Sequence, residues 1–217
     1  SPILRDQEIT FGLDLAHAVG NIPLELHDWG IDFASWCTYK YLNAGPGSIA
    51  GYFVNHKHHA DKKLVRLAGW WGNDPDTRFD MHGQENFIPR QSADGWKTSN
   101  PSLLAMIPLK ESLEMFAEHG MVSLRERSVR LTNFFEKGVR SIKNISSITP
   151  TDPERRGCQI SIRVPGSASD LEEKLFGCGV VPDARDPDIL RFAPVPMYST
   201  FTDIARAVQV LDRLVTN

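Results

Sequence analysis

Apolar residues in the first quarter of the chain gather in short runs that have no helical period. One run covers residues 9–16, a second covers residues 30–37, and a third, rich in β-branched and aromatic residues, covers residues 48–54. Short runs of this kind are typical of buried strands. The pattern therefore predicts three strands, and it places Asp14 at the carboxyl end of the first.

The pattern changes after Pro101, where apolar positions recur at helical spacing. They predict a helix that Gly120 ends, with Ser99 or Asn100 available as the capping residue. An apolar stripe predicts a second helix over residues 122–142. The chain therefore passes from short strands to long amphipathic helices.

The rest of the chain alternates two predicted strands, 159–164 and 189–192, with two predicted helices, 168–177 and 201–215. Residues 55–100 differ from both halves, because they lack periodicity and are rich in glycine, aspartate, asparagine and tryptophan. They are predicted to form long irregular segments. Loops this long in a compact protein usually carry function.

These elements predict an α/β fold, namely the later part of a larger sheet covered by helices, followed by a smaller α+β layer. We expect a large domain over residues 1–119 and a small C-terminal domain over residues 120–217. Sites in such sheets lie at the carboxyl ends of strands. The end of the first strand is therefore a candidate site.

Composition excludes several classes of partner. The 217 residues are 41% hydrophobic and 24% charged, as in a globular protein, and 24 basic against 27 acidic residues give a net charge of −3. With no block of like charge, neither nucleic acid nor an anionic membrane is an expected partner. The chain shows no membrane-spanning run and no signal peptide, so we expect a cytoplasmic protein that binds a small molecule or another subunit.

Metal and disulfide chemistry find no support in the sequence. The three cysteines are an odd number without C-x-x-C spacing, which argues against a disulfide framework and a structural zinc site. His56, His58 and His59 lie in a polar, lysine-containing stretch that is interpreted as solvated surface. No metal ligand is therefore predicted.

Lys40 is the residue whose setting is most unusual. It lies between Tyr39 and Tyr41 in a run that is otherwise aromatic and neutral. A lysine is expensive to bury unless it is paired or used chemically, for example as a nucleophile. The alternative is a surface lysine whose aliphatic stem lies along apolar neighbours.

Six stretches of the chain, in order, resemble the kynureninases. These are fold-type I enzymes that depend on pyridoxal 5'-phosphate (PLP), and they are related to class V aminotransferases and cysteine desulfurases. The likeness covers nearly the whole chain and implies the same fold and cofactor. The matching stretches are residues 14–21, 27–33, 39–47, 69–72, 99–101 and 191–198.

The resemblance implies roles for residues near Lys40. Lys40 would form the Schiff base with PLP and then act as the base on the substrate. Asp14 would pair with the pyridine nitrogen, which keeps it protonated, and His17 would lie beside the cofactor. Taken alone, Asp14 would more often be a turn or capping residue and His17 a packing or hydrogen-bonding residue.

Other roles implied by the resemblance concern residues farther along the chain. Tyr39, Trp70 and Asn100 would bind the cofactor, although an aromatic residue taken alone is more often a packing residue. Trp70 and Asn100 would serve a neighbouring subunit, so a homodimer is expected. Arg191 would hold the α-carboxylate of the substrate through paired hydrogen bonds.

The implied reaction is hydrolysis of kynurenine or 3-hydroxykynurenine to alanine and anthranilate or 3-hydroxyanthranilate, in tryptophan catabolism and NAD biosynthesis. Ser99 and Asn100 resemble the form that favours the 3-hydroxylated substrate. Asn73 departs from it, because some relatives have histidine there.

Without the family, Arg191 would be assigned to a surface ion pair with Asp186 or Asp188.

Kynureninases are about twice as long, and this chain resembles their later part. The chain starts without methionine, which suggests that it derives from something longer. In the family, the preceding half supplies the aromatic ring that stacks on the cofactor and part of the phosphate site. We therefore expect weak or no activity from this chain alone. The alternatives are an inactive fragment or paralogue that acts only as an association partner, or a cysteine desulfurase, which the lack of a cysteine in a glycine-rich loop disfavours.

Overall fold

The computed structural model describes residues 2–80 and 82–216. The chain divides into two compact units. Unit 1 consists of Ser1–Gly20 and Leu24–Phe116, and unit 2 consists of Asn21–Pro23 and Ala117–Asn217. The domain boundary between residues 119 and 120 stays a prediction. In the structure, the chain passes from unit 1 to unit 2 between residues 116 and 117.

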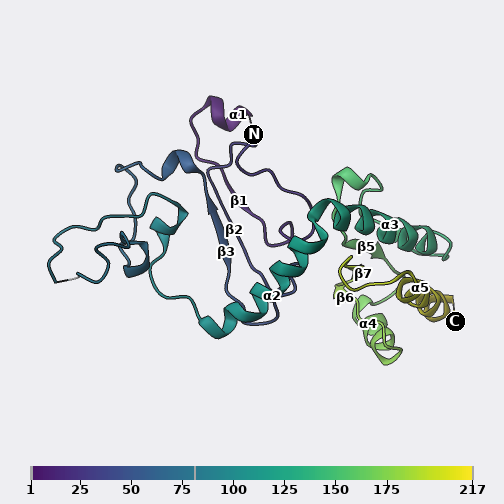
Figure 1. Cartoon of the computed structure of the whole chain (residues 1–217). Helices are drawn as coiled ribbons and strands as arrows, with labels where there is room; N and C mark the ends of the chain where they lie inside the picture. The colour runs from purple at the N-terminus through teal and green to yellow at the C-terminus, as the bar shows by residue number, and fades with distance from the viewer. Residues whose placement is uncertain (1, 81, 217) are drawn as a thin grey trace. The chain divides into compact units, whose positions relative to one another are not determined.

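Unit 1 is built on a three-stranded sheet with the order β1-β2-β3 (Figure 1). The strands are β1 (Gly12–Asp14), β2 (Phe33–Trp36) and β3 (Gly51–Val54). β1 pairs with β2 in parallel, and β3 pairs with β2 in the antiparallel sense. The three predicted strands are confirmed, but each is shorter than its apolar run. A short first helix, α1 (Pro2–Asp6), was not predicted.

Just before β1, the N–H of Phe11 donates to Asp32 Oδ2 at 2.7 Å, and the carbonyl of Phe11 accepts the N–H of Asp32 at 3.0 Å. At the other end, Asp14 lies opposite Ser35 as the last residue of the strand. This confirms the predicted place of Asp14. The N–H of Leu15 still reaches the carbonyl of Ser35 at 2.9 Å, so the chain leaves the sheet along a defined path.

Among the described residues of 55–100, the regular structure consists of short 3-10 turns and one isolated antiparallel bridge between Asn73 and Pro89. These turns are His56–His58, Trp70–Gly72 and Ala93–Trp96. The prediction of long irregular segments is confirmed. The interpretation of the histidines as solvated surface is wrong for His58 and His59, which are half-buried and bond to Asp32 and the carbonyl of Val54.

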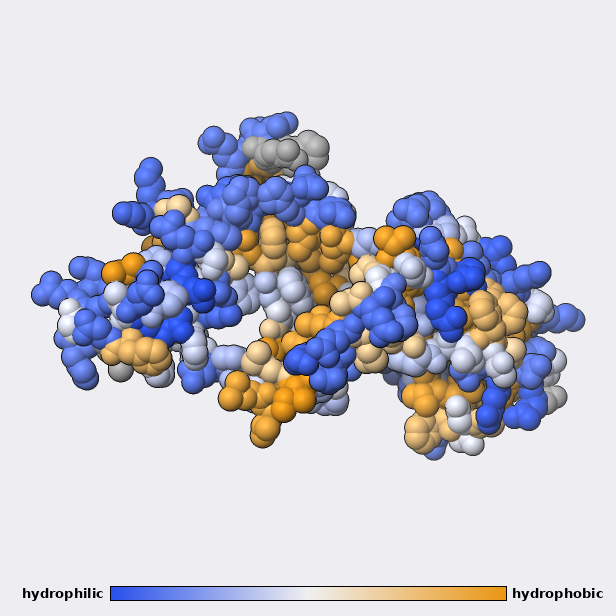
Figure 2. Space-filling view, in the orientation of Figure 1, coloured by the Kyte–Doolittle hydropathy of each residue, from blue (hydrophilic) through white to orange (hydrophobic). Residues whose placement is uncertain are grey.

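Two helices meet at Gly120, which has a φ of +74°. α2 (Leu103–His119) ends before Gly120, and α3 (Met121–Val139) begins after it. The prediction that Gly120 ends the helix is therefore confirmed. Ser102, whose carbonyl accepts the N–H of Met106, opens α2, so the predicted caps at 99 and 100 lie too early. Figure 2 shows apolar side chains gathered at the amino end of α2, where Leu103 and Leu104 are exposed.

Unit 2 contains a four-stranded antiparallel sheet with the order β4-β5-β7-β6. The helices α4 and α5 agree with the predicted ranges to within a residue, and β5 and β7 do so as well. β4 and β6 were not predicted, because neither has an apolar pattern. The bounds are β4 Ser146–Ser147, β5 Ile160–Arg163, α4 Ala168–Gly177, β6 Asp183–Arg185, β7 Ile189–Phe192 and α5 Phe201–Thr216.

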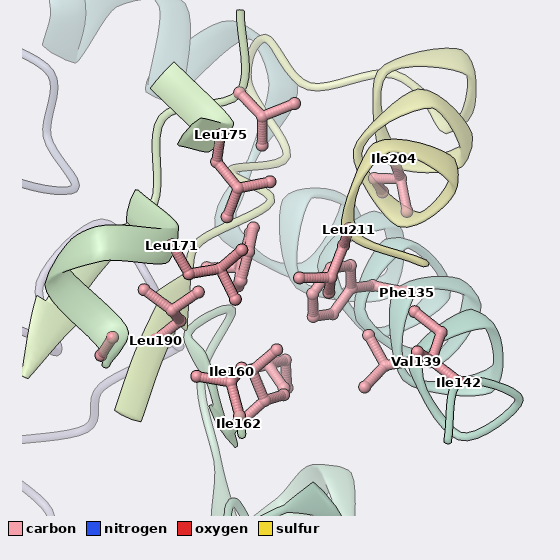
Figure 3. Close-up of a cluster of buried hydrophobic side chains, with 14 of the residues drawn as sticks. Phe135, Val139, Ile142, Ile160, Ile162, Leu171, Leu175, Leu190, Ile204 and Leu211 are labelled. Carbon is pink, nitrogen blue, oxygen red and sulfur yellow. The ribbon is translucent and has the colours of Figure 1, made fainter. Parts of the chain in front are cut away.

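The core of unit 2 is a cluster of aliphatic and aromatic side chains between the sheet and its helices (Figure 3). Phe135 and Phe192 pack with ring centroids 5.0 Å apart, and each fully buried aliphatic chain contributes about 1.5 to 3 kcal/mol. The segment 21–23 joins this unit because Asn21 Oδ1 accepts the N–H of Cys158 at 2.9 Å. Other members of the core are Leu131, Val139, Ile142, Ile160, Ile162, Leu171, Leu175, Leu190, Ile204 and Leu211.

Candidate functional site

The candidate site lies at one edge of the unit 1 sheet. Because β1 and β2 are parallel, their carboxyl ends meet at the same edge. Asp14 is the last residue of β1, and Lys40 follows the end of β2 at Trp36 by four residues. The N–H of Ala16 donates to Asp14 Oδ1 at 2.9 Å and orients the exposed carboxylate. The topology therefore brings an acid and an amine to one edge.

His17 is the direct partner of Lys40, with 3.1 Å between His17 Nε2 and Lys40 Nζ. The ring of His17 also meets the buried Tyr41 edge-on, at a centroid distance of 5.8 Å. The turn after β1, in which the N–H of Ala18 donates to the carbonyl of Leu15, carries the imidazole to this place. Lys40 is half-buried and bonds to an imidazole. A surface lysine that points freely into solvent would have neither feature.

Close backbone packing holds the two site loops together. Gly20 has a φ of +79°, and a Cβ there would lie 2.7 Å from the carbonyl oxygen of Tyr41. Only glycine suits both the conformation and the space. Cys37 Sγ also lies 3.9 Å from the carbonyl oxygen of Ala16. The loop that carries His17 therefore packs directly on the loop that carries Lys40.

The Lys40 loop is compact and anchored in unit 1. The N–H of Asn43 donates to the carbonyl of Lys40 at 2.9 Å, and Asn43 takes a positive φ of +57°. Ser112 of α2 donates its hydroxyl to the carbonyl of Leu42. Tyr39 is half-exposed, and its ring centroid lies 5.8 Å from Lys40 Nζ. Its predicted contact with the cofactor stays a prediction.

The opposite end of β2 is anchored by Asp32. This buried carboxylate accepts the N–H of Phe11 and lies 2.5 Å from Lys57 Nζ and 2.7 Å from His58 Nε2. Burial raises the pKa of Asp32, but hydrogen bonds from Lys57, Phe11 and His58 outweigh it and lower the pKa from 3.8 to about 2. β2 is therefore tied by a charged network at one end and continues into the Lys40 loop at the other.

The segment Gly69-Trp70-Trp71-Gly72 packs against residues 95–98. A Cβ on Gly69 would lie 2.2 Å from the Cα of Thr98, and a Cβ on Gly72 would lie 2.6 Å from the carbonyl oxygen of Lys97. Both neighbours are backbone atoms, which have little freedom to move aside. The two glycines therefore flank the tryptophans for a steric reason.

Trp70 and Asn100 make hydrogen bonds to other residues of unit 1. Trp70 Nε1 donates to the carbonyl of Arg78 at 3.1 Å, and Trp71 Nε1 donates to Asn100 Oδ1. The guanidinium of Arg78 lies 4.2 Å from the ring centroid of Trp71. The roles predicted for Trp70 and Asn100 at the cofactor stay predictions, and in this structure their polar groups bind within unit 1.

Asn73 also has partners inside its own loop. Its Oδ1 accepts the N–H of Ile88 at 3.1 Å, and its Nδ2 donates to Gln84 Oε1 at 2.9 Å. Both halves of the amide therefore hold the loop closed.

Arg191 lies on β7 in unit 2. Its Nε and Nη2 both bind Asp183 Oδ2, across the β6–β7 pairing in which these two residues are opposite. The ion pairs considered from the sequence, with Asp186 or Asp188, are wrong. Asp186 instead accepts a hydrogen bond from the hydroxyl of Ser169, and Asp188 pairs with an arginine on β5.

Several residues that shape the Lys40 loop were missed from the sequence, namely Thr38, Ser48 and Ser112. A buried hydroxyl in an apolar run is the one available signal, and Thr38 gives it. Ser112 gives none, because it contacts a loop 70 residues earlier in the chain. Long-range pairs of this kind have no local pattern.

Residues 2–80 and 82–216 contain neither a metal-binding cluster nor a membrane-spanning helix. No group of three or more histidine, cysteine, aspartate or glutamate side chains is arranged to hold a metal ion in these ranges. Among the same residues, no helix has both the length and the apolar character needed to cross a membrane. Cys37, Cys158 and Cys178, which all lie within the described ranges, form no disulfide.

The fold is that of the fold-type I PLP-dependent enzymes. The chain superposes on a cysteine desulfurase from Escherichia coli with a TM-score of 0.78 and 18% identity, covering 99% of this chain and 54% of that one. A cysteine desulfurase from Thermococcus onnurineus gives 0.76 at 14% identity, with 99% and 55% covered. An alanine–glyoxylate aminotransferase from Nostoc gives 0.69 at 15% identity, with 98% and 55% covered. At these identities the likeness concerns the fold alone.

Sequence comparison identifies the family. Residues 124–211 match the model of the kynureninase C-terminal domain. The chain is 50% identical to kynureninases from Xanthomonas oryzae, over 93% of this chain and 48% of the relative, and from Salinispora tropica, over 92% and 47%. It therefore belongs to the kynureninase family and spans about half the length of the curated relatives it matches.

Proposed function

We propose that this chain carries the lysine-bearing part of a kynureninase-type active site, which uses PLP to hydrolyse kynurenine or 3-hydroxykynurenine. The observation that supports this most is the pairing of Lys40 Nζ with His17 Nε2, 3.1 Å apart, at the edge where β1 and β2 end. The 50% identity to kynureninases supports the reaction class. The products would be alanine and anthranilate or its 3-hydroxy form.

The residues present suit PLP by their chemistry. Lys40 offers an amine that could hold the cofactor covalently, and Asp14 at the same edge offers a carboxylate for its ring nitrogen. Asn43 Nδ2 is buried without a hydrogen-bond partner among the described residues, so the Lys40 loop keeps an unused donor. When bound, PLP supplies an electron-withdrawing ring that stabilises negative charge at the substrate Cα.

Lys40 and His17 would handle the proton in this reaction. Lys40 Nζ and His17 Nε2 lie within hydrogen-bond distance of one another, and the tautomer of His17 decides which of them donates. A free Lys40 amine could therefore take a proton from the substrate Cα and return it. Asp14, whose Oδ1 accepts the N–H of Ala16, would pair with the ring nitrogen of the cofactor. Tyr39, which is half-exposed, would donate a hydrogen bond from its hydroxyl to the cofactor.

Arg191 would bind the α-carboxylate of the substrate. In this structure its Nε and Nη2 are directed at Asp183, which also lies 3.2 Å from Arg185 Nη2. Asp183 therefore orients the guanidinium of Arg191 and competes with any carboxylate that approaches it. A substrate would bind by using the remaining N–H groups or by displacing Asp183.

The complete site would need groups from outside this chain. Because the chain spans about half the length of its relatives, we propose that their other half supplies further cofactor contacts. Trp70 and Asn100 would face the site of a second subunit in a homodimer. The protein would act in the cytoplasm, in tryptophan catabolism and NAD biosynthesis.

A spectroscopic titration tests the proposal. PLP is added to the chain, to Lys40→Ala and to Lys143→Ala, which removes an exposed lysine in unit 2. We expect a shifted visible absorbance band in the wild type and in Lys143→Ala, and free-PLP absorbance in Lys40→Ala. Identical spectra for all three proteins would contradict the assignment of Lys40. Formation of 3-hydroxyanthranilate from 3-hydroxykynurenine tests whether this chain is active alone.

An association role without catalysis is the alternative, and exposed apolar side chains favour it. Leu103, Leu104 and Ile107 on α2 are largely exposed, and so is Phe33 on β2. A chain that forms stable dimers but neither binds PLP nor turns over substrate would support this role. Binding of PLP at Lys40 would favour the enzymatic one.

A further inference from the structure

We propose that Thr38 and Ser48 form a hydroxyl clasp that positions Lys40. The inference rests on the proposed function of Lys40 and adds two positioning residues to it. Thr38 Oγ1 lies 2.6 Å from Ser48 Oγ and 2.6 Å from the carbonyl oxygen of Ile49. These contacts join the two ends of the loop that carries Lys40.

The direction of the two bonds follows from the number of protons. A threonine hydroxyl has one proton to donate, whereas its oxygen can accept more than one bond. The carbonyl of Ile49 can only accept, so the Thr38 hydroxyl donates to it. The Ser48 hydroxyl must then donate to Thr38 Oγ1. One arrangement therefore satisfies both contacts, and Thr38 lies at its centre.

The same residue holds the loop through its backbone. The N–H of Ala44 donates to the carbonyl of Thr38 at 3.1 Å, so Thr38 bonds to the loop through its carbonyl and its side chain. The side chain of Thr38 is almost completely buried, so water does not compete for its hydrogen bonds. Lys40 follows Thr38 by two residues, so its side chain extends from a backbone that these bonds hold in place.

The far side of the loop is also fixed, which makes the clasp the closing element. Tyr41, Leu42 and Ala44 are buried, and Ser112 of α2 binds the carbonyl of Leu42. With the far side packed and the ends joined, the start of the Lys40 side chain is held on both sides. The clasp therefore sets how closely Lys40 Nζ approaches His17.

Three variants test the clasp. Thr38→Val removes the hydroxyl and keeps the shape, Thr38→Ser restores the hydroxyl, and Thr132→Val removes another buried hydroxyl, which binds the carbonyl of Ser128 in unit 2. Each protein is incubated with PLP, reduced with borohydride and digested. The rate at which the Lys40 peptide is labelled is then measured, together with hydrogen exchange at Ala44.

We expect Thr38→Val to slow labelling of Lys40 about tenfold and to speed exchange at Ala44, which corresponds to the loss of one net hydrogen bond. Thr38→Ser should label within about twofold of the wild type, and Thr132→Val should label like the wild type. Ser48→Ala, which removes only the outer donor, should slow labelling less than Thr38→Val. It also keeps the test decisive if Thr38→Val does not fold.

The outcomes separate this inference from the proposed function. If wild-type Lys40 is labelled and Thr38→Val or Ser48→Ala is labelled at the same rate, the clasp does not position Lys40, while the proposed function stands. Equal slowing in Thr38→Val and Thr132→Val would also overturn the clasp, because the effect would then be general destabilisation. If wild-type Lys40 is not labelled, the proposed function fails and the positioning role fails with it.

Discussion

The two units of this chain are held together by different means. Unit 2 encloses a continuous apolar core between a four-stranded sheet and the helices α3, α4 and α5. Unit 1 has three short strands and long irregular segments, which are fixed by charged and hydroxyl side chains and by close backbone contacts at glycines. The candidate lysine site lies in the second kind of structure.

The difference bears on how a site is held. An apolar core tolerates exchange of similar side chains, because its energy depends on buried area and volume. A loop such as that of Lys40 depends on individual bonds that have no substitute. Unit 1 should therefore be sensitive at single polar or glycine positions, and unit 2 should be sensitive to the loss of volume.

The largest effect is expected in the core of unit 2. Leu190→Ala removes a fully buried side chain from β7 and should lower the free energy of unfolding by about 2 to 5 kcal/mol. Phe176→Ala, at an exposed position of α4, is the control and should stay within about 0.5 kcal/mol of the wild type. Urea unfolding measures both. Equal losses in the two variants would contradict the described core.

A glycine of unit 1 should give the next effect. Gly69→Ala forces its Cβ against the backbone of Thr98, so we expect a loss of about 1 to 3 kcal/mol and altered tryptophan fluorescence. Gly177→Ala is the control, because a Cβ there meets nothing within 4 Å, and alanine suits a helix better. A stable Gly69→Ala protein with unchanged fluorescence would remove the steric argument for this segment.

Acid should weaken unit 1 through Asp32. Its folded-state pKa of about 2 lies below the ordinary value of 3.8, so the stabilisation is complete above about pH 4. It is lost as the pH falls towards 2, and it amounts to about 2 kcal/mol. Denaturant midpoints measured at several pH values should show this loss in the wild type and not in Asp32→Asn. Asp28→Asn, at an exposed neighbouring position, should behave like the wild type.

The smallest effect is expected at Arg191. If Asp183 competes with a substrate carboxylate, Asp183→Asn should tighten binding of kynurenine about fivefold, whereas Arg191→Ala should weaken it. Isothermal titration measures both. Weaker binding in Asp183→Asn would mean that the carboxylate serves to orient Arg191 and does not compete for it.

Much of the fold could be predicted because apolar spacing reflects a buried face. The ranges of α4 and β7 follow from it directly. α3 is an instructive exception: the apolar pattern continues to Ile142, but the helix ends at Val139, because Ile142 remains buried in the turn that follows. Burial therefore extends farther than the helix.

The site could be predicted only in part. Asp14 at a strand end and Lys40 beyond the next strand follow from pattern and from the resemblance. The partner of Arg191 does not, because the register of β6 against β7 selects Asp183, and β6 has no apolar signal. Contacts between distant segments, such as Asn21 with Cys158, likewise have no local pattern.

The central claim is that Lys40 is the residue that binds PLP. The most direct measurement is to incubate the chain with PLP, reduce it with borohydride and map the labelled peptides by mass spectrometry. We expect the label to concentrate at Lys40, beside His17, before any other lysine reacts. Label spread over the exposed lysines, with no preference for Lys40, would contradict it.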